Sequence, residues 1–212
     1  MNKKIVLITP ATRPKNLKII FKSINWDYIS RWIIVYDKKI IHKNPFLFKK
    51  NKNIIELINL NSRSIRGSGQ RNMALRYLDE EKIDNNYIYF LDDDNIIHPN
   101  FYKVCKKFKN KKIYTFNQQV KIRYIRKGNK IKVNFIDTAM FVVDYDLAKK
   151  VRWRMQIYET DYYFIKTCLK KNNNKYVYIN ETGCYYNYLA DNFYRRNLKR
   201  FKTYIYNNIF KF

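Results

Sequence analysis

The sequence predicts an α/β fold in which helices flank a mostly parallel central sheet. The first sign is a strand–helix–strand order: an apolar run at 5–8, helically spaced apolar residues over 15–25, and a second apolar run at 32–36. This order is typical of a βαβ unit, whose two strands run parallel. The second sign is the run 87–91, which lacks polar alternation and is therefore expected to be buried on both faces.

The other apolar segments continue this pattern along the chain. A short third strand is predicted at 54–58, a helix at about 70–81, and another helix from His98 to about Phe108. The later elements are expected to be strands at 112–121 and 130–135 around a turn at Gly128-Asn129, a strand at 140–143, a helix opening at 146–148, a helix at 162–169 and a strand at 176–179.

Length and composition favour one domain. The chain has 212 residues, 46% of them hydrophobic, and only 4 glycines and 4 prolines, so no linker divides it. We predict a domain over 1–190 and a basic aromatic helical tail over 191–212. A basic amphipathic tail either packs its aromatic side on the domain or faces an anionic membrane, and packing is the commoner use of such a helix.

The charge of the chain is strongly positive. It carries 44 Lys and Arg against 17 Asp and Glu, a formal net charge of +27. Such a balance favours an anionic partner: nucleic acid, an anionic membrane face or an acidic substrate. Lys, Asn, Ile, Tyr and Phe are all abundant, as an AT-rich genome imposes, so the charge alone selects none of these partners.

The cysteines and the apolar runs bear on the compartment. Cys105, Cys168 and Cys184 are far apart and form no CxxC pair, which argues against a disulfide framework or a zinc site. A reducing cytosol fits best. No apolar run reaches about 18 residues, so we expect a soluble or peripheral protein, cytoplasmic or on the inner membrane face, or in a host cytoplasm if viral.

Three consecutive aspartates follow the strand at 87–91. Asp92, Asp93 and Asp94 repel one another and cannot be buried unpaired, which places them at the exposed carboxyl end of the strand. Ligands of open α/β sheets bind at this edge, and Mg²⁺ or Mn²⁺ prefers carboxylate oxygen. The pattern favours a divalent metal site; the alternative is a solvated Asp-rich turn.

A glycine-containing stretch flanked by arginines precedes the helix predicted at 70–81. Arg66, Gly67, Gly69 and Arg71 suit a phosphate cradle, because glycine amides at a helix start and forked guanidiniums both bind phosphate oxygens. The spacing is neither a Walker A motif nor GxGxxG. The alternative is a flexible loop with solvated arginines.

Other polar residues follow predicted strands or precede a helix. Thr9, Arg13 and Asp37 each lie just beyond a strand, where they suit recognition of a base and ribose, although each alone also fits a turn or cap. Glu159 and Asp161 lie before the helix at 162–169. One of them would suit a general base, and ordinary capping of the helix is the alternative.

In this order, these motifs resemble the GT-A nucleotide-sugar glycosyltransferases, most closely the family 2-like set and small viral or bacterial relatives. The likeness spans roughly residues 3–190. It implies a single GT-A, Rossmann-like domain that uses Mn²⁺ or Mg²⁺. It also implies transfer of a sugar from a nucleotide-diphosphate sugar, UDP-linked by expectation, to a hydroxyl of a glycan or lipid-linked acceptor with inversion.

The resemblance also implies roles at the aspartates. Asp94 would be the direct metal ligand, Asp92 would lie near the metal and the donor's ribose or sugar, and Asp93 would belong to the donor site. Many relatives supply a late histidine as a further ligand. In this chain the matching region offers Asn187 or Cys184, since His42 and His98 are not placed there.

The remaining roles fall to the other motifs. Thr9, Arg13 and Asp37 would hold the nucleoside, and Arg71, with Arg66, would contact base or phosphate. Asp137, in the run Asp137-Thr138-Ala139, would approach the donor sugar or the acceptor. Asp161 would be the catalytic base, with Glu159 as second choice.

Two other functions compete with this one. A sugar-phosphate nucleotidyltransferase also joins a nucleotide to a sugar with acidic residues and metal, but it is expected to carry a glycine-rich loop after the first strand, and residues 9–14 contain no glycine. A non-enzymatic nucleic-acid-binding protein would suit the +27 charge and 17% aromatic residues. No known nucleic-acid-binding motif is recognised, so no specific nucleic acid is expected.

Overall fold

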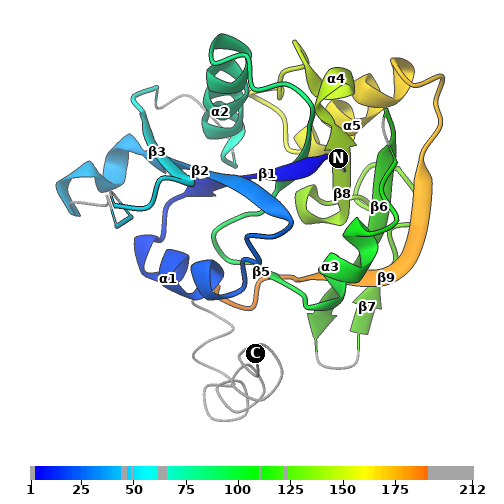
Figure 1. Cartoon of the computed structure of the whole chain (residues 1–212), viewed down its shortest axis with the longest axis horizontal. Coiled ribbons are helices and arrows are strands. Elements are labelled where there is room, and N and C mark those ends of the chain that lie inside the picture. Colours follow the sequence, from blue (N-terminus) through cyan, green and yellow to red (C-terminus); the bar gives the residue numbers. More distant parts are fainter. Residues whose placement is uncertain are drawn as a thin grey trace.

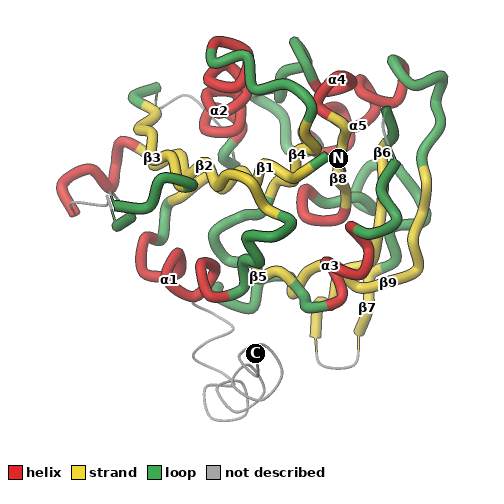
Figure 2. Tube along the Cα trace, viewed as in Figure 1, coloured by secondary structure: helices red, strands yellow, loops and turns green. Residues whose placement is uncertain are grey.

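One curved sheet with helices on both faces forms the core of the protein (Figures 1 and 2). A computed structural model describes residues 3–43, 47–48, 50–61, 66–109, 111–121 and 124–190. The strands are β1 (Lys4–Ala11), β2 (Ile29–Asp37), β3 (Ile54–Asn59), β4 (Asn86–Phe90), β5 (Ile96–Ile97), β6 (Ile113–Lys121), β7 (Tyr124–Arg126), β8 (Phe141–Asp144) and β9 (Val177–Tyr185).

The helices alternate with these strands along the chain. They are α1 (Pro14–Lys22), α2 (Ser68–Glu80), α3 (Asn100–Cys105), α4 (Tyr145–Ala148) and α5 (Thr160–Lys170), with 3₁₀ helices η1 (Lys38–Lys43) and η2 (Thr138–Met140). Proline at the first position of α1 suits that site, because its fixed backbone angle is helical and its missing amide has no partner in the first turn. The predicted α/β fold is confirmed.

The sheet has two halves of different direction. Its order is β3-β2-β1-β4-β8-β6-β9-β5, with β7 paired to β6. The first four strands run parallel, as predicted. β8 runs antiparallel to both of its neighbours, and β9 returns to a parallel pairing with β6, so the second half is mixed rather than mostly parallel.

Helices cover both faces, which explains the unbroken apolar runs. Along β1, Ile5 and Leu7 face the core under α1 and α3, whereas Val6 and Ile8 face the core under α2, α4 and α5. Figure 1 shows these two helical layers on opposite sides of the strands. Each strand residue is therefore buried whichever way it points, and the polar alternation typical of a half-exposed strand is absent.

The predicted strand at 130–135 is wrong. The strand that follows β6 and pairs antiparallel with it is β7, which ends before Gly128, and residues 130–135 form a turn without strand pairing. Gly128 serves a close approach instead of a hairpin turn. A Cβ there would lie 2.2 Å from the carbonyl oxygen of Phe116, so only glycine fits against that backbone.

The tail predicted at 191–212 lies outside the described residues. None of the helices in the described part of the chain combines the length and the apolar character needed to span a bilayer.

Candidate active site

A cavity of about 400 Å³ opens where β1 and β4 end. The strand order reverses here, since the chain moves outward from β1 to β2 and β3 and then returns to β4 on the other side. Such switch points at the carboxyl edge are where open α/β sheets bind ligands. The described residues that line it are Pro10, Thr12, Arg13, Arg66, Gly67, Arg71, Asp92, Asp93, Asp94, Asp137, Thr138, Asp161, Tyr186 and Asn187.

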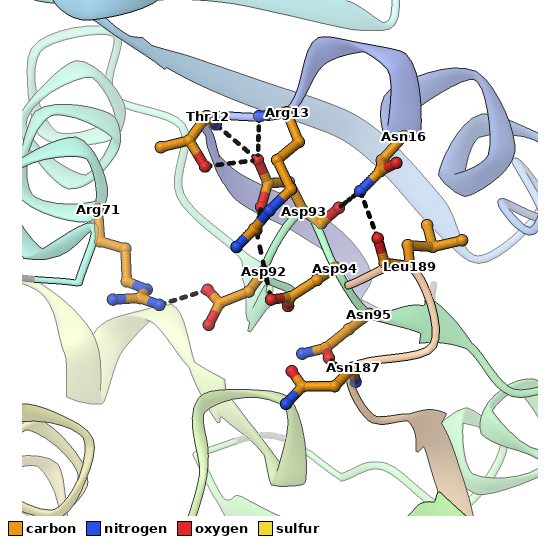
Figure 3. A network of polar contacts seen from close by, with 10 residues as sticks. All are labelled: Thr12, Arg13, Asn16, Arg71, Asp92, Asp93, Asp94, Asn95, Asn187 and Leu189. Atoms are coloured by element: carbon orange, nitrogen blue, oxygen red, sulfur yellow. Dashed lines mark hydrogen bonds and ion pairs between the residues drawn. The ribbon is translucent and has the colours of Figure 1, made fainter. Parts of the chain in front are cut away.

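Asp93 is the most strongly bonded of the three consecutive aspartates (Figure 3). One carboxylate oxygen accepts hydrogen bonds from the amides of Thr12 at 2.5 Å and Arg13 at 2.6 Å, and from the Thr12 hydroxyl at 3.1 Å. The other accepts from the Arg13 guanidinium at 2.5 Å. Its buried carboxylate thus fixes the loop between β1 and α1, and its donor-site role stays a prediction.

Arg71 holds Asp92 from the first turns of α2. Its guanidinium donates to Asp92 and, at 2.7 Å, to the carbonyl of Arg66, and it lies 4.7 Å from the centre of the Trp153 ring. Burial alone would lower the pKa of Arg71, but the charges of Asp92, Asp161 and Asp137 raise it above its ordinary value. Arg71 thus compensates the carboxylates around it, and its contact with a base or phosphate stays a prediction.

Asp94 is held less completely. Its carboxylate lies 3.3 Å from the Arg13 guanidinium, and its backbone carbonyl accepts from the amide of Leu189 at 2.8 Å. Burial, followed by the charge of Asp92, raises the pKa of Asp94 to about 7. The Arg13 guanidinium offsets only part of this rise, and a bound cation would offset more of it.

Asn187 lies beside this group of aspartates. Its backbone amide donates to the side-chain oxygen of Asn95 at 2.8 Å, which ties the segment after β9 to the aspartate turn. In Figure 3, Asp94 lies between Asp92 and Asn187. Carboxylate and amide oxygens are the donors that Mg²⁺ and Mn²⁺ prefer, so these three side chains suit such an ion.

The other candidate ligands fit less well. Within the described residues, no group of three His, Cys, Asp or Glu side chains is arranged to hold a metal ion, so a third protein donor would have to be of another type. Cys184 is fully buried, and burial raises the pKa of its thiol well above the ordinary value, which disfavours the thiolate needed for ligation. The Nδ1 atom of His98 accepts from the amide of Asn100 at 3.1 Å, away from the cavity lining.

Asp137 and Asp161 also line the cavity. Asp137 caps η2 by accepting from the amide of Ala139 at 3.1 Å, and Asp161 lies in the first turn of α5. Burial raises the pKa of both carboxyl groups, and the charge of Asp92 raises them further, whereas Arg71 offsets part of the shift at Asp161. A carboxylate of raised pKa in a cavity is suited to accepting a proton.

Glu159 differs from Asp161 although only one residue separates them. It occupies the N-cap position of α5, is exposed, and makes no side-chain capping bond. It is not part of the cavity lining. Of the two predicted bases, only Asp161 faces the acidic cavity.

Two predicted nucleoside contacts also lie outside the cavity. Thr9 is fully buried, and its hydroxyl accepts from the indole nitrogen of Trp32 at 2.9 Å, so it cannot reach a ligand there. Asp37 accepts from the side-chain amide of Gln70 at 3.2 Å beyond the lining residues. Arg13 and Arg66 do line the cavity, and Arg66 also stacks 4.6 Å from the centre of the Tyr158 ring.

The sequence reasoning missed four side chains of the lining: Pro10, Thr12, Thr138 and Tyr186. Each adjoins a residue that was singled out, so proximity along the chain is the only available signal. Gly67 was noted for phosphate binding but has a further role. Its backbone is left-handed, with φ of +77°, and a Cβ would lie 2.8 Å from Pro10 Cβ, so any other residue would push α2 away from β1.

Comparisons with known proteins show the fold. No protein-family model matches the sequence, and no curated protein does. A 4-diphosphocytidyl-2C-methyl-D-erythritol synthase structure matches with a TM-score of 0.57 at 8% identity, over 85% of this chain and 89% of that one. The synthase of the same name from Anaerococcus prevotii DSM 20548 matches with a TM-score of 0.52 at 14% identity, over 87% and 88%.

A third structure is of another kind of enzyme. A putative glucose-1-phosphate thymidylyltransferase from Bacillus anthracis, in complex with a sucrose, matches with a TM-score of 0.52 at 12% identity, over 85% of this chain and 87% of that one. At such identities the likeness establishes a shared architecture and leaves the reaction open.

Proposed function

We propose that this protein is a divalent-cation-dependent glycosyltransferase. It transfers a sugar from a nucleoside-diphosphate sugar, UDP-linked by preference, to a hydroxyl of a glycan or lipid-linked acceptor with inversion. One observation carries the proposal: Asp92, Asp94 and Asp161 line one cavity, so acid groups suited to two different tasks border the same space.

The β4 side suits the leaving group. Asp94, Asp92 and Asn187 would hold Mn²⁺ or Mg²⁺, which offsets the negative charge that a departing nucleoside diphosphate develops. Arg13 and Arg66 border the same space and would add positive charge to the diphosphate. Arg71 keeps Asp92 in place, because its guanidinium donates to that carboxylate from a buried position.

Asp161 and Asp137 suit the nucleophile. Asp161 would take the proton from the attacking hydroxyl as that oxygen bonds to the anomeric carbon and the bond from this carbon to the diphosphate breaks. Its raised pKa supports this role, since a carboxylate that binds a proton near neutral pH is a stronger base than an ordinary one. Asp137 would orient the donor sugar or the acceptor from the adjoining position.

A nucleotidyltransferase is the second candidate, and the shared fold with a thymidylyltransferase favours it. The loop after β1 argues against it. The amides of Thr12 and Arg13 already donate to Asp93, so these groups are not free to cradle a triphosphate at the strand end. A glycosyltransferase needs no such cradle in this loop.

The test separates the two candidates by their products. The full chain is incubated with Mn²⁺ and a panel of nucleotide sugars, and separately with nucleoside triphosphates and sugar phosphates. Release of a nucleoside diphosphate in the first set, with calorimetric binding of the same donor, is the expected result. Pyrophosphate in the second set, without donor binding in the first, would establish the nucleotidyltransferase instead.

A further inference from the structure

A second hollow, of about 750 Å³, lies between the end of α1 and α3. The loop that borders it, residues 23–28, leads into the start of β2, so the hollow lies at the amino edge of the parallel strands, opposite the acidic cavity. We call it the basic hollow. Its described lining is Lys22, Ser23, Ile24, Asn25, Trp26, Tyr28, Ile97, Pro99, Asn100, Tyr102, Lys103 and Lys106.

Hydrogen bonds and ring contacts fix the walls of the basic hollow. The hydroxyl of Tyr102 donates to the carbonyl of Ser23 at 2.6 Å and accepts from the amide of Asn25 at 2.8 Å, which ties α3 to the loop. The ring of Tyr28 lies 5.4 Å from that of Tyr102. The space is therefore a formed feature of the fold rather than a gap under a loose loop.

The interior offers little to a polar ligand. The Tyr102 hydroxyl already makes the two hydrogen bonds to Ser23 and Asn25, and the Ser23 hydroxyl donates to the carbonyl of Ile20 at 2.7 Å. The side-chain oxygen of Asn25 accepts from the amide of Asp27 at 2.9 Å. Ile24 and Ile97 are buried in the lining. The rings of Trp26, Tyr28 and Tyr102 also border the space, so a ligand with an apolar body suits it.

The rim has the opposite character. Lys103 on α3 and Lys106 directly after it are exposed, and Lys22 lies at the end of α1. No aspartate or glutamate is among the described lining residues. Two carboxylates lie close to this lining: Asp27 is in the bordering loop, and an oxygen of Glu181 accepts from the side-chain nitrogen of Asn100 at 3.4 Å. The lysines leave an excess of positive charge at the mouth.

We propose that the basic hollow binds an acidic lipid. The hydrocarbon chain would lie against the rings of Trp26, Tyr28 and Tyr102, and the phosphate head would lie on the lysines. The positive charge of the lysines favours an acidic head group. Because the polar groups of the interior bond to one another, the space favours a hydrocarbon chain. The site is separate from the acidic cavity and does not depend on the reaction catalysed there.

The test uses short-chain lipids that dissolve as monomers, so that general adsorption of a +27 chain to a charged surface does not interfere. Dihexanoylphosphatidylglycerol and dihexanoylphosphatidylcholine are titrated separately into the full chain in a calorimeter. We expect saturable binding of the acidic lipid at one site and at least about tenfold weaker binding of the zwitterionic one. Equal affinity for both lipids, or no binding of either, would overturn the proposal.

Two double variants locate the site. K103Q/K106Q removes two rim charges and is expected to weaken binding of the acidic lipid about tenfold or more. K166Q/K170Q removes the same charge from exposed positions on α5, in the other helical layer, and should leave binding unchanged. An equal loss in both variants would show charge attraction without a site. If inorganic phosphate bound as tightly as the lipid, the hydrocarbon chain would contribute nothing to binding, and the proposal of a lipid site would be refuted.

Discussion

The aspartates of the acidic cavity are held in opposite ways. Asp93, beside the β1–α1 loop, accepts hydrogen bonds from two amides, a hydroxyl and a guanidinium. Asp137 and Asp161 are half-buried, and the loss of water around their carboxyl groups raises their pKa values. Asp94 lies beside Asp93 in the chain but resembles Asp137 and Asp161, with a pKa of about 7.

The difference separates aspartates that build the site from aspartates that act in it. A carboxylate surrounded by donors stabilises the fold, and no ligand is needed to compensate its charge. A carboxylate crowded by other carboxylates destabilises the fold until a cation or a proton binds. The four predictions below test this division, from the largest expected effect to the smallest.

Replacing Asp93 by Ala should cost about 4–5 kcal/mol of unfolding free energy. The change leaves the amides of Thr12 and Arg13 without their acceptor and separates a largely buried charge from its partner. Urea unfolding of the variant and the parent measures the effect. A loss under about 1 kcal/mol would mean that the loop does not depend on Asp93.

Replacing Asp161 by Asn should lower the rate of sugar transfer about 10²–10⁴-fold while donor binding stays intact, because the change removes a proton acceptor and keeps the shape. Glu159→Gln is the matched control: it removes one carboxylate nearby, outside the cavity, and should change the rate less than about twofold. Steady-state rates and calorimetry of both variants measure this. Equal losses in the two would remove the distinction between these residues.

Replacing Asp94 by Asn should weaken cation-dependent donor binding about 100-fold, since even an outer-shell partner of a metal ligand is worth about 10–100-fold. The same variant should be as stable as the parent, or more so, in metal-free buffer at pH 8, because it removes a carboxylate that is unfavourable when charged. Calorimetry with Mn²⁺ and thermal unfolding give the two readouts. A destabilised variant with unchanged binding would reverse the assignment.

The metal-free protein should lose a few kcal/mol of stability from these carboxyl groups as the pH rises from about 4 to about 7. In this range the folded state keeps a proton that the unfolded chain has released, so stability falls steadily and levels off once the pH passes the folded pKa, which is about 7 for Asp94. Excess Mg²⁺ should flatten this dependence. Unfolding curves across this range, with the Asp94→Asn variant as reference, test the sign.

The parallel half of the fold could be predicted because its strands are buried on both faces. Ile5 to Ile8 and Tyr87 to Leu91 are unbroken apolar runs, and polar residues follow them at the edge where the cavity forms. The second half of the sheet, in which parallel and antiparallel strands mix, was harder to predict. The glycine at Gly128 suggested a hairpin turn, whereas its actual constraint is contact with the backbone of Phe116, a residue on another strand.

The cavity itself was predicted in outline and not in detail. Its aspartates were identified, but three identical neighbours give no sign of which one faces the Thr12 and Arg13 amides. Thr9 was expected beside them because it follows an apolar run, yet β1 continues to Ala11 and buries it against Trp32. Such outcomes depend on where a turn directs each side chain, and that is set by contacts between segments distant in sequence.

The segment after β9 gives the site a reporter of its own. The amide of Leu189 donates to the carbonyl of Asp94, while the side chain of Asn16 donates to the carbonyls of both Asp93 and Leu189 (Figure 3). The amide proton of Leu189 is thus hydrogen-bonded directly to the aspartate turn. Its hydrogen-exchange rate should fall when a cation steadies that turn, so the state of the site can be followed without a substrate.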